Sequence, residues 1–123
     1  LAWFWSHGGE RHPLIAAEQD GRVAGYACLS DYRPYEAYKG TAELSVYVSR
    51  DFRRQGIGEA LMRELLDMAE LRKLHTVISV ITGNNEASIR LHEKMGFSYC
   101  GTMHRAGEKF GQLLDIVNYE FLI

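Results

Sequence analysis

The chain has 123 residues, of which 46% are hydrophobic and 24% charged, the balance of one soluble globular domain. Fourteen basic and sixteen acidic residues leave a net charge of -2, so we expect neither nucleic acid nor a membrane surface as a partner. No apolar run is long enough to span a bilayer. Cys28 and Cys100 lie in apolar stretches without metal-ligand spacing, which predicts two buried thiols, no metal site and a cytoplasmic location.

Turn residues and alternating hydrophobicity divide the first part of the chain. We expect residues 1–7, which include Trp3, Phe4 and Trp5, to form a packed amphipathic element, with the aromatics in the core of a helix. Strands are predicted at 13–19 and 22–30, joined by a two-residue Asp-Gly turn. Residues 41–49 alternate strictly and predict a strand that places Glu43, Ser45 and Tyr47 on one face and Leu44, Val46 and Val48 on the other.

Helical periodicity appears in the second part. Apolar residues recur every four positions and predict a helix over 56–73. Asn85 is expected to cap a second helix that runs to Met95, with Gly96 directly after it.

Strands complete the second part. The β-branched residues of 75–82 predict one strand between the two helices, and two final strands at 97–103 and 113–123 flank a loop at 105–112. The order predicts an α/β fold with a mixed, mostly antiparallel sheet flanked by helices. A crossover around the first helix predicts at least one parallel strand pair.

The strongest local signal joins the strand at 41–49 to the helix at 56–73 and reads RDFRRQGIGEAL. Its glycines and the new helix would offer unpaired N–H groups to a phosphate, and Arg53 and Arg54 would add charge. A dinucleotide-binding loop would need a glycine where Leu61 stands, and the Gly-Lys-Ser/Thr of a Walker A loop does not occur. The alternative is an ordinary turn beside a solvated basic surface.

The segment RRQGIG resembles the Q/R-x-x-G-x-G/A signature of the GNAT superfamily of N-acetyltransferases, whose members use this loop to hold the pyrophosphate of acetyl-coenzyme A (acetyl-CoA). The segments TAELSVYVS, NNEASIRLHEKMGF and RAGEKFGQLLDI resemble the phosphinothricin acetyltransferase group, which includes methionine sulfone and sulfoximine acetyltransferases. The resemblance implies the GNAT fold for a single domain over 1–123. Family members carry a further strand and helix before the segment equivalent to 1–7, so it also implies an N-terminally incomplete domain.

The resemblance implies that acetyl-CoA is the co-substrate and that no metal takes part. Asn85 has the competing interpretation of a plain helix cap, and it could serve both roles. The implied coenzyme contacts are Val46, Tyr47, Val48, Arg53, Arg54, Gln55, Gly56, Ile57, Gly58, Glu59, Asn85 and Lys94.

Two residues are implied as catalytic. Glu43 would activate the acceptor amine, directly or through water; the alternative is a solvent-facing strand glutamate. His92 stands where many members carry the tyrosine that protonates the leaving thiolate. General acid, substrate contact and hydrogen-bonded core residue all remain open for it.

We expect the acceptor substrate to bind at the loop before the strand at 41–49. Arg33 can clamp an α-carboxylate and Tyr35 can wall a side-chain pocket, whereas the alternative is an exposed turn. The implied substrate contacts are Arg33, Pro34, Tyr35, Glu43, Leu44 and Ser45.

These residues predict an N-acetyltransferase that modifies the α-amine of a small amino acid or analogue by direct attack, since no cysteine lies near the site in sequence. The resemblance further suggests a homodimer. Two alternatives are a protein or peptide N-acetyltransferase, and a coenzyme A binding module without turnover.

Overall fold

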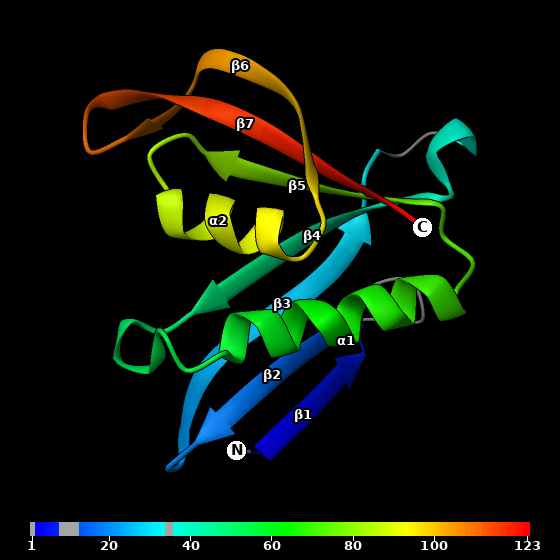
Figure 1. Ribbon diagram of the computed structural model, residues 1–123, viewed down its shortest axis with the longest axis vertical. Coiled ribbons are helices and arrows are strands. Elements are labelled where there is room, and N and C mark those ends of the chain that lie inside the picture. Colours follow the sequence, from blue (N-terminus) through cyan, green and yellow to red (C-terminus); the bar gives the residue numbers. More distant parts are fainter. Residues whose placement is uncertain (1, 8–12, 34–35) are drawn as a thin grey trace.

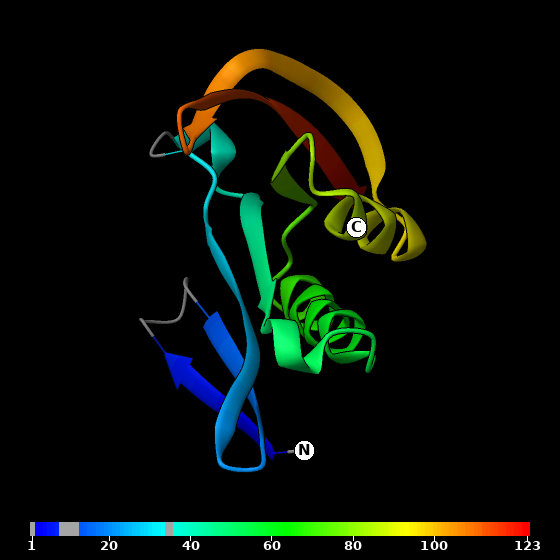
Figure 2. The same ribbon diagram turned by 90° about the vertical axis from the view of Figure 1, so that its left-hand side faces the viewer.

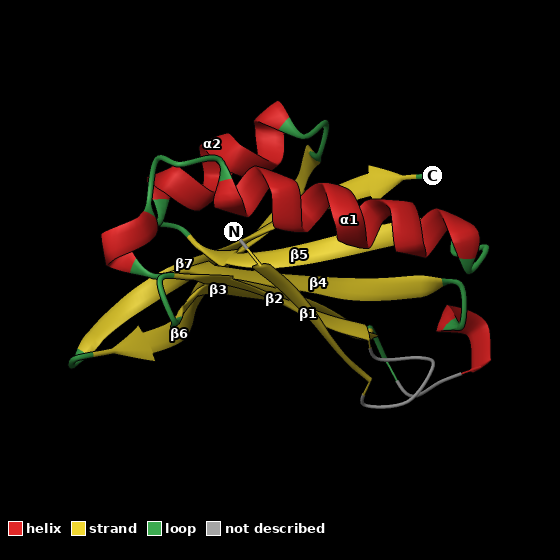
Figure 3. Ribbon diagram, turned by 90° about the horizontal axis from the view of Figure 1, so that it is seen from below, coloured by secondary structure: helices red, strands yellow, loops and turns green. Residues whose placement is uncertain are grey.

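The computed structural model describes residues 2–7, 13–33 and 36–123, which form one mixed seven-stranded sheet with two α-helices on one face (Figures 1 and 3). The strands lie in the order β1-β2-β3-β4-β5-β7-β6, and the neighbours β4 and β5 are parallel while the other neighbouring pairs are antiparallel. The strands are β1 (Ala2–His7), β2 (Pro13–Gln19), β3 (Arg22–Asp31), β4 (Thr41–Val48), β5 (Thr76–Thr82), β6 (Ser98–Lys109) and β7 (Gln112–Leu122). The helices are α1 (Ile57–Leu71) and α2 (Glu86–Lys94), with short 3₁₀ turns η1 (Glu36–Tyr38) and η2 (Arg50–Phe52).

The predicted fold class is confirmed, as are the tight hairpin and the parallel pair. Asp20 and Gly21 have φ of 57° and 74°, the left-handed values that a two-residue hairpin turn requires. The parallel pair β4–β5 brackets α1 in sequence, as a β-α-β crossover does.

Residues 2–7 form strand β1, so the prediction of a helix there is wrong. β1 pairs with β2 from Ala2 opposite Glu18 to His7 opposite Pro13. Aromatic residues suit strands, and pairing with a long neighbour decides the conformation of a short segment whose own pattern is ambiguous.

The predicted loop at 105–112 is also wrong for the most part. β6 continues to Lys109 and β7 begins at Gln112, and Figure 2 shows the pair as a long, arched hairpin. The polar stretch is accommodated by a bulge between Met103 and Gly107, where the backbone N–H of Arg105 donates to Oδ1 of Asp115 at 3.0 Å.

The prediction of two buried thiols is wrong as well. Cys28 is half-buried and Cys100 is exposed on β6, the strand at the end of the sheet order. Cys100 is exposed because its strand lies at an edge of the sheet, whereas Cys28, on the interior strand β3, pairs with Ser45 on the face that lies away from the helices.

The core lies between the sheet and the helices. α1 packs against β2, β3 and β4, and its stripe of Ile57, Leu61, Leu65 and Ala69 is at most 3% exposed. The strands contribute alternating residues to the same side, among them Leu29, Leu44 and Val77. No helix in the described part of the chain is long and apolar enough to cross a membrane.

Gly25 of β3 lies where β3, β4 and α1 pack closely against one another. A Cβ at this position would lie 2.6 Å from the carbonyl oxygen of Tyr47, a backbone atom that cannot rotate away. We therefore expect Gly25→Ala to lower the free energy of unfolding by about 1–3 kcal/mol, the usual cost of overpacking, in a urea titration.

Gly107→Ala is the matched control, because its Cβ would first meet the flexible end of the Ile116 side chain at 3.0 Å. A Gly25→Ala protein as stable as the Gly107→Ala protein would contradict this packing.

Candidate active site

β4 and β5 part from one another after a short paired segment. Their parallel register runs from Thr41 opposite Thr76 to Glu43 opposite Ile78 and then ends, although both strands continue. Figure 1 shows the two ribbons diverging from this point. We call the point of separation, at Leu44 and Ser79, the fork. Beyond it, the backbone groups of residues 45–48 that turn toward β5 have no partner on that strand and can bond an inserted ligand.

Glu43 lies directly beside the fork on the face of the sheet that the helices leave open. Its neighbours Ala42 and Leu44 are buried beneath the helices, so alternation directs the half-buried Glu43 side chain to the opposite face. Ser45 and Tyr47 share that face, and the Tyr47 ring lies 5.5 Å from the Tyr26 ring. Glu43, Ser45 and Tyr47 therefore share the open face, whereas the side chain of Leu44, which was also expected to contact the substrate, is buried on the opposite face.

Cys28 also lies on this face, which its position in the sequence did not indicate. It pairs with Ser45, and burial raises the pKa of its thiol; a hydrogen bond from Ser45 acts against this rise and the Glu43 charge adds to it. A thiol with a raised pKa stays protonated near neutral pH and is a poor nucleophile. Because the Cys28 thiol is a poor nucleophile, direct attack by the acceptor amine is a simpler route than transfer through an acetylated cysteine.

His92 lies on the helix-covered face, so the two candidate catalytic residues are on opposite sides of the sheet. The ring is 2% exposed and packs edge-on against Phe97, with ring centroids 4.9 Å apart. Both ring nitrogens are engaged: Nδ1 lies 2.7 Å from the Ser88 carbonyl oxygen and Nε2 lies 2.8 Å from Oγ of Ser79. Burial lowers the pKa of His92, while the Ser88 bond acts in the opposite direction. Ser79, which contacts both Nε2 of His92 and the Leu44 carbonyl oxygen, links the ring to the fork.

Ser79 was not anticipated from the sequence. It is 1% exposed, and its Oγ lies within hydrogen-bond distance of two groups, the carbonyl oxygen of Leu44 at 3.3 Å and Nε2 of His92 at 2.8 Å. The sequence did contain one indication. In the β-branched strand, Ser79 is a polar residue that alternates with Val77 and Ile81 on the buried face, and a buried polar group needs a hydrogen-bond partner.

The loop between β4 and α1 has the shape expected of an anion cradle. Arg54 and Gly56 both have left-handed backbones, with φ of 64° and 76°, and buried Phe52 anchors the loop. Gly56 is the N-cap of α1 and provides no side-chain cap, so N–H groups of the first turn stay available to a ligand. A Cβ at Gly56 would meet nothing within 4 Å, which means that the space in front of this turn is open.

The two glycines of the loop have different tasks. Whereas Gly56 supplies a left-handed turn, a Cβ at Gly58 would lie 2.9 Å from Cδ2 of Leu91, so Gly58 lets α1 and α2 approach closely. Beside this contact, Lys94 Nζ lies 3.0 Å from the carboxylate of Glu59, and this ion pair is the main cause that lowers the pKa of Glu59. Lys94 therefore lies beside the loop, with its charge paired to Glu59.

The remaining predicted contacts divide between described and undescribed residues. Asn85 is the N-cap of α2, where its Oδ1 accepts from the backbone N–H of Ser88 at 3.2 Å, so the capping interpretation holds. Arg33 is exposed, with its guanidinium 4.8 Å from the centre of the Tyr32 ring. Pro34 and Tyr35 lie outside the described residues. Within the described ranges no three His, Cys, Asp or Glu side chains gather as metal ligands would.

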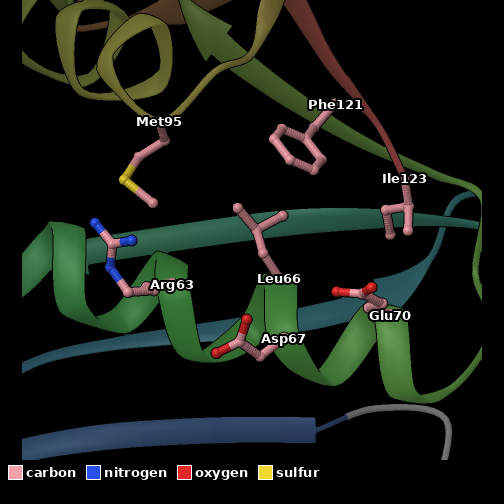
Figure 4. Close-up of a pocket in the computed structure, with 7 residues that line it drawn as sticks. All are labelled: Arg63, Leu66, Asp67, Glu70, Met95, Phe121 and Ile123. Carbon is pink, nitrogen blue, oxygen red and sulfur yellow. The ribbon is translucent and has the colours of Figure 1, made fainter.

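A separate groove lies between α1, the end of α2 and the end of β7. Figure 4 shows Leu66 of α1 pointing toward Met95 and Phe121, with Asp67 and Glu70 beside it on the helix. None of its lining residues is among those predicted for coenzyme or acceptor. The groove is therefore distinct from the fork.

Comparison with known proteins agrees with this geometry. Residues 1–97 match the model of the acetyltransferase (GNAT) family. The chain belongs to this family. It is 41% identical over 94% of its length to the L-methionine sulfoximine/L-methionine sulfone acetyltransferase of Pseudomonas paraeruginosa, and it spans about two thirds (67%) of that protein.

Solved structures of GNAT proteins superpose closely on the chain. The ribosomal-protein-alanine N-acetyltransferase of Brucella melitensis is 42% identical, with a TM-score of 0.87 over 91% of this chain and 69% of its own. The GNAT superfamily phosphinothricin acetyltransferase of Sinorhizobium meliloti, in complex with acetyl-CoA, is 35% identical, with a TM-score of 0.87 over 93% of this chain and 62% of its own. The predicted family and fold are thus confirmed.

Burial of His92 predicts a pH dependence of stability. Its pKa is lowered on folding, so the folded state binds fewer protons than the unfolded state below the ordinary histidine pKa of about 6.5. This contribution to stability is fully present above that value and is lost as the pH falls toward the folded pKa. We expect the free energy of unfolding from urea titrations between pH 8 and pH 5 to fall less in His92→Gln than in the wild type.

His75→Gln is the control, because His75 is an exposed histidine whose Nδ1 lies 2.9 Å from a neutral group, Oγ1 of Thr76. It should retain the wild-type slope. Equal slopes in the wild type and His92→Gln would contradict the pKa direction.

Proposed function

We propose that this chain is an N-acetyltransferase that transfers the acetyl group of acetyl-CoA to the α-amine of a small amino acid or analogue, of the phosphinothricin, methionine sulfone or methionine sulfoximine type. The observation that carries the proposal is the 41% identity, over nearly the whole chain, to a relative named for acetylating methionine sulfoximine and methionine sulfone. The fork, with Glu43 beside it, supports it because a direct-attack reaction needs a base next to the bound thioester.

The residues present suit acetyl-CoA. The open, uncapped start of α1 and the left-handed Gly56 would receive the pyrophosphate, with charge from Arg53 and Arg54. The remaining loop contacts would come from Gln55, Ile57, Gly58 and Glu59. Backbone groups of Val46, Tyr47 and Val48 would bond the pantetheine arm where β5 no longer pairs. The bound coenzyme supplies the thioester whose acetyl group is transferred.

Glu43 would take the proton from the acceptor's ammonium group, directly or through water. Its place at the last paired position of β4 brings the carboxylate next to the fork while leaving it on the face that an acceptor can reach. Arg33, Pro34 and Tyr35 would form the acceptor pocket together with Ser45 and the backbone of Leu44, whose side chain is buried in the core. Arg33 follows β3 shortly after Ser30, the cross-strand partner of Glu43, so a carboxylate clamp there would hold the acceptor at the right end of the sheet.

A second candidate function has its own observation. The Brucella relative with 42% identity is named as a ribosomal-protein-alanine N-acetyltransferase, which favours acetylation of a protein N-terminus. A coenzyme A binding module without turnover is the third alternative. We further propose a cytoplasmic homodimer with no nucleic-acid or membrane partner, on the family resemblance and the near-neutral charge.

If the acceptor is a small amino acid, the protein should acetylate such acceptors selectively, and its activity should depend on Glu43. With acetyl-CoA, we expect release of free thiol with methionine sulfone, methionine sulfoximine or phosphinothricin and none with a peptide that begins with alanine. Glu43→Gln should lower kcat/KM about 100-fold or more at neutral pH, because a general base contributes about that much.

Ser30→Ala, which changes the cross-strand partner of Glu43, is the control and should retain most activity. Thiol release with the alanine peptide alone would favour the second function. Coenzyme binding without release for any acceptor would favour the module, and an unchanged rate in Glu43→Gln would reject the assigned base.

The anion cradle predicts that Gly56→Val weakens acetyl-CoA binding at least about tenfold in calorimetry, because a β-branched residue resists the left-handed turn that presents the N–H groups. Gly111→Val is a matched control: Gly111 has φ of 75°, also faces open space, and lies at the β6–β7 turn. Both variants carry the same backbone strain, so equal coenzyme affinity in the two would contradict the cradle.

A further inference from the structure

The hydroxyl of Ser79 stands where the sheet would otherwise have a backbone hydrogen bond. Continuing the β4–β5 register beyond Glu43 opposite Ile78 puts Leu44 opposite Ser79. At this position, where the register between the strands has ended, Oγ of Ser79 lies 3.3 Å from the Leu44 carbonyl oxygen and can donate to it. A side chain therefore closes the paired segment, and the fork begins at a group that can carry a proton.

The hydrogen-bond chain on His92 fixes which nitrogen carries the proton. The Ser88 carbonyl can only accept, so Nδ1, 2.7 Å away, carries the hydrogen in the neutral ring. Nε2 then has a free lone pair and takes the Ser79 hydroxyl hydrogen at 2.8 Å. If His92 is protonated, Nε2 donates to Oγ and the hydroxyl hydrogen turns to the Leu44 carbonyl. The direction in which the Ser79 hydroxyl donates therefore depends on whether His92 is neutral or charged.

We propose that Ser79 is a catalytic residue of the acetyltransferase site, which passes a proton between a group bound at the fork and the buried ring of His92. The inference rests on the proposed function: Glu43 takes the first proton of the ammonium group before attack, and the nitrogen must lose a second proton after attack, for which this inference assigns a path. It also accounts for the placement of His92, which lies on the helix-covered face and has no direct contact with Glu43 on the other face.

The proton step balances without any further reagent. When the nitrogen that has attacked the thioester loses its second proton, that N–H bond breaks and an O–H bond forms on Oγ of Ser79, while the original O–H bond breaks and an N–H bond forms at Nε2 of His92. Ser79 ends as a neutral hydroxyl, and His92 gains one positive charge. The same exchange in reverse returns the proton to an acceptor at the fork and leaves His92 neutral.

The surroundings of His92 suit a neutral resting ring. Tyr119 of β7 lies with its ring centroid 6.5 Å away, and its hydroxyl lies 3.5 Å from Glu93 of α2. Tyr99 of β6 packs against Tyr119 in turn. Burial and the Ser88 carbonyl are the causes of the His92 pKa shift, with no charged partner among them. A ring that is neutral at rest is ready to receive a proton from Ser79.

Ser79→Ala and Ser79→Thr test the inference in the full chain, with NMR titration of the His92 ring as the first measurement. We expect Ser79→Ala to lower the pKa of His92 by about 1 unit, because the charged ring loses its acceptor at Nε2. Ser79→Thr keeps the hydroxyl and should restore the value. Ser98→Ala, an exposed serine of β6, should leave it unchanged, and a urea titration confirms that each variant is folded.

Activity gives the second measurement. In Ser79→Ala, kcat should fall about tenfold or more with KM for acetyl-CoA within about twofold, and the pH profile should shift with the His92 pKa. A folded Ser79→Ala protein with an unchanged His92 pKa and pH profile would overturn the inference, as would a folded Ser79→Thr protein that restores neither. If the wild type acetylates no acceptor, the proposed function fails, and the NMR titration still decides whether Ser79 and His92 are coupled.

Discussion

The separation of β4 from β5 is the feature on which the rest of the structure depends. Each strand is fully paired on its other side, β4 with β3 from Ala42 to Val48 and β5 with β7 along its length. The hydrogen bonds between β4 and β5 can therefore end after three paired positions while both strands remain part of the sheet. An opening of this kind exposes backbone donors and acceptors inside a folded core, which is costly unless a ligand or a side chain bonds them. Oγ of Ser79 lies within hydrogen-bond distance of the first carbonyl of the opening, and the bound coenzyme would bond other groups.

The two helices hold the halves of the sheet together across this opening. α1 covers β2, β3 and β4, whereas α2 reaches β5 through the bond from His92 to Ser79. The helices meet where Gly58 approaches Leu91 and where Glu59 pairs with Lys94. Both Gly58 and Glu59 belong to the loop expected to receive the pyrophosphate. Binding there would thus act on the same contact that keeps the halves of the sheet in register.

Local signals predicted much of the fold and of the site. The Asp20-Gly21 turn, the four-residue period of α1 and the caps at Asn85 and Gly96 each depend on a few neighbouring residues, and each was confirmed. The helix predicted for residues 1–7 failed because pairing with β2, a tertiary interaction, decided that segment. The bulge opposite Asp115 was missed for the same reason, since it exists only through a bond between two strands.

The Ser79–His92 pair shows why a site is harder to read from a sequence than its motifs are. His92 was found because of its position in a family motif, but nothing local shows that its ring turns away from Glu43. Ser79 carries no motif, and its role depends on the register between β4 and β5 together with the packing of α2. The sheet separates a candidate base on the open face from a candidate proton acceptor in the core. The fork is the place where the two faces meet, so a reaction that uses both groups must take place there.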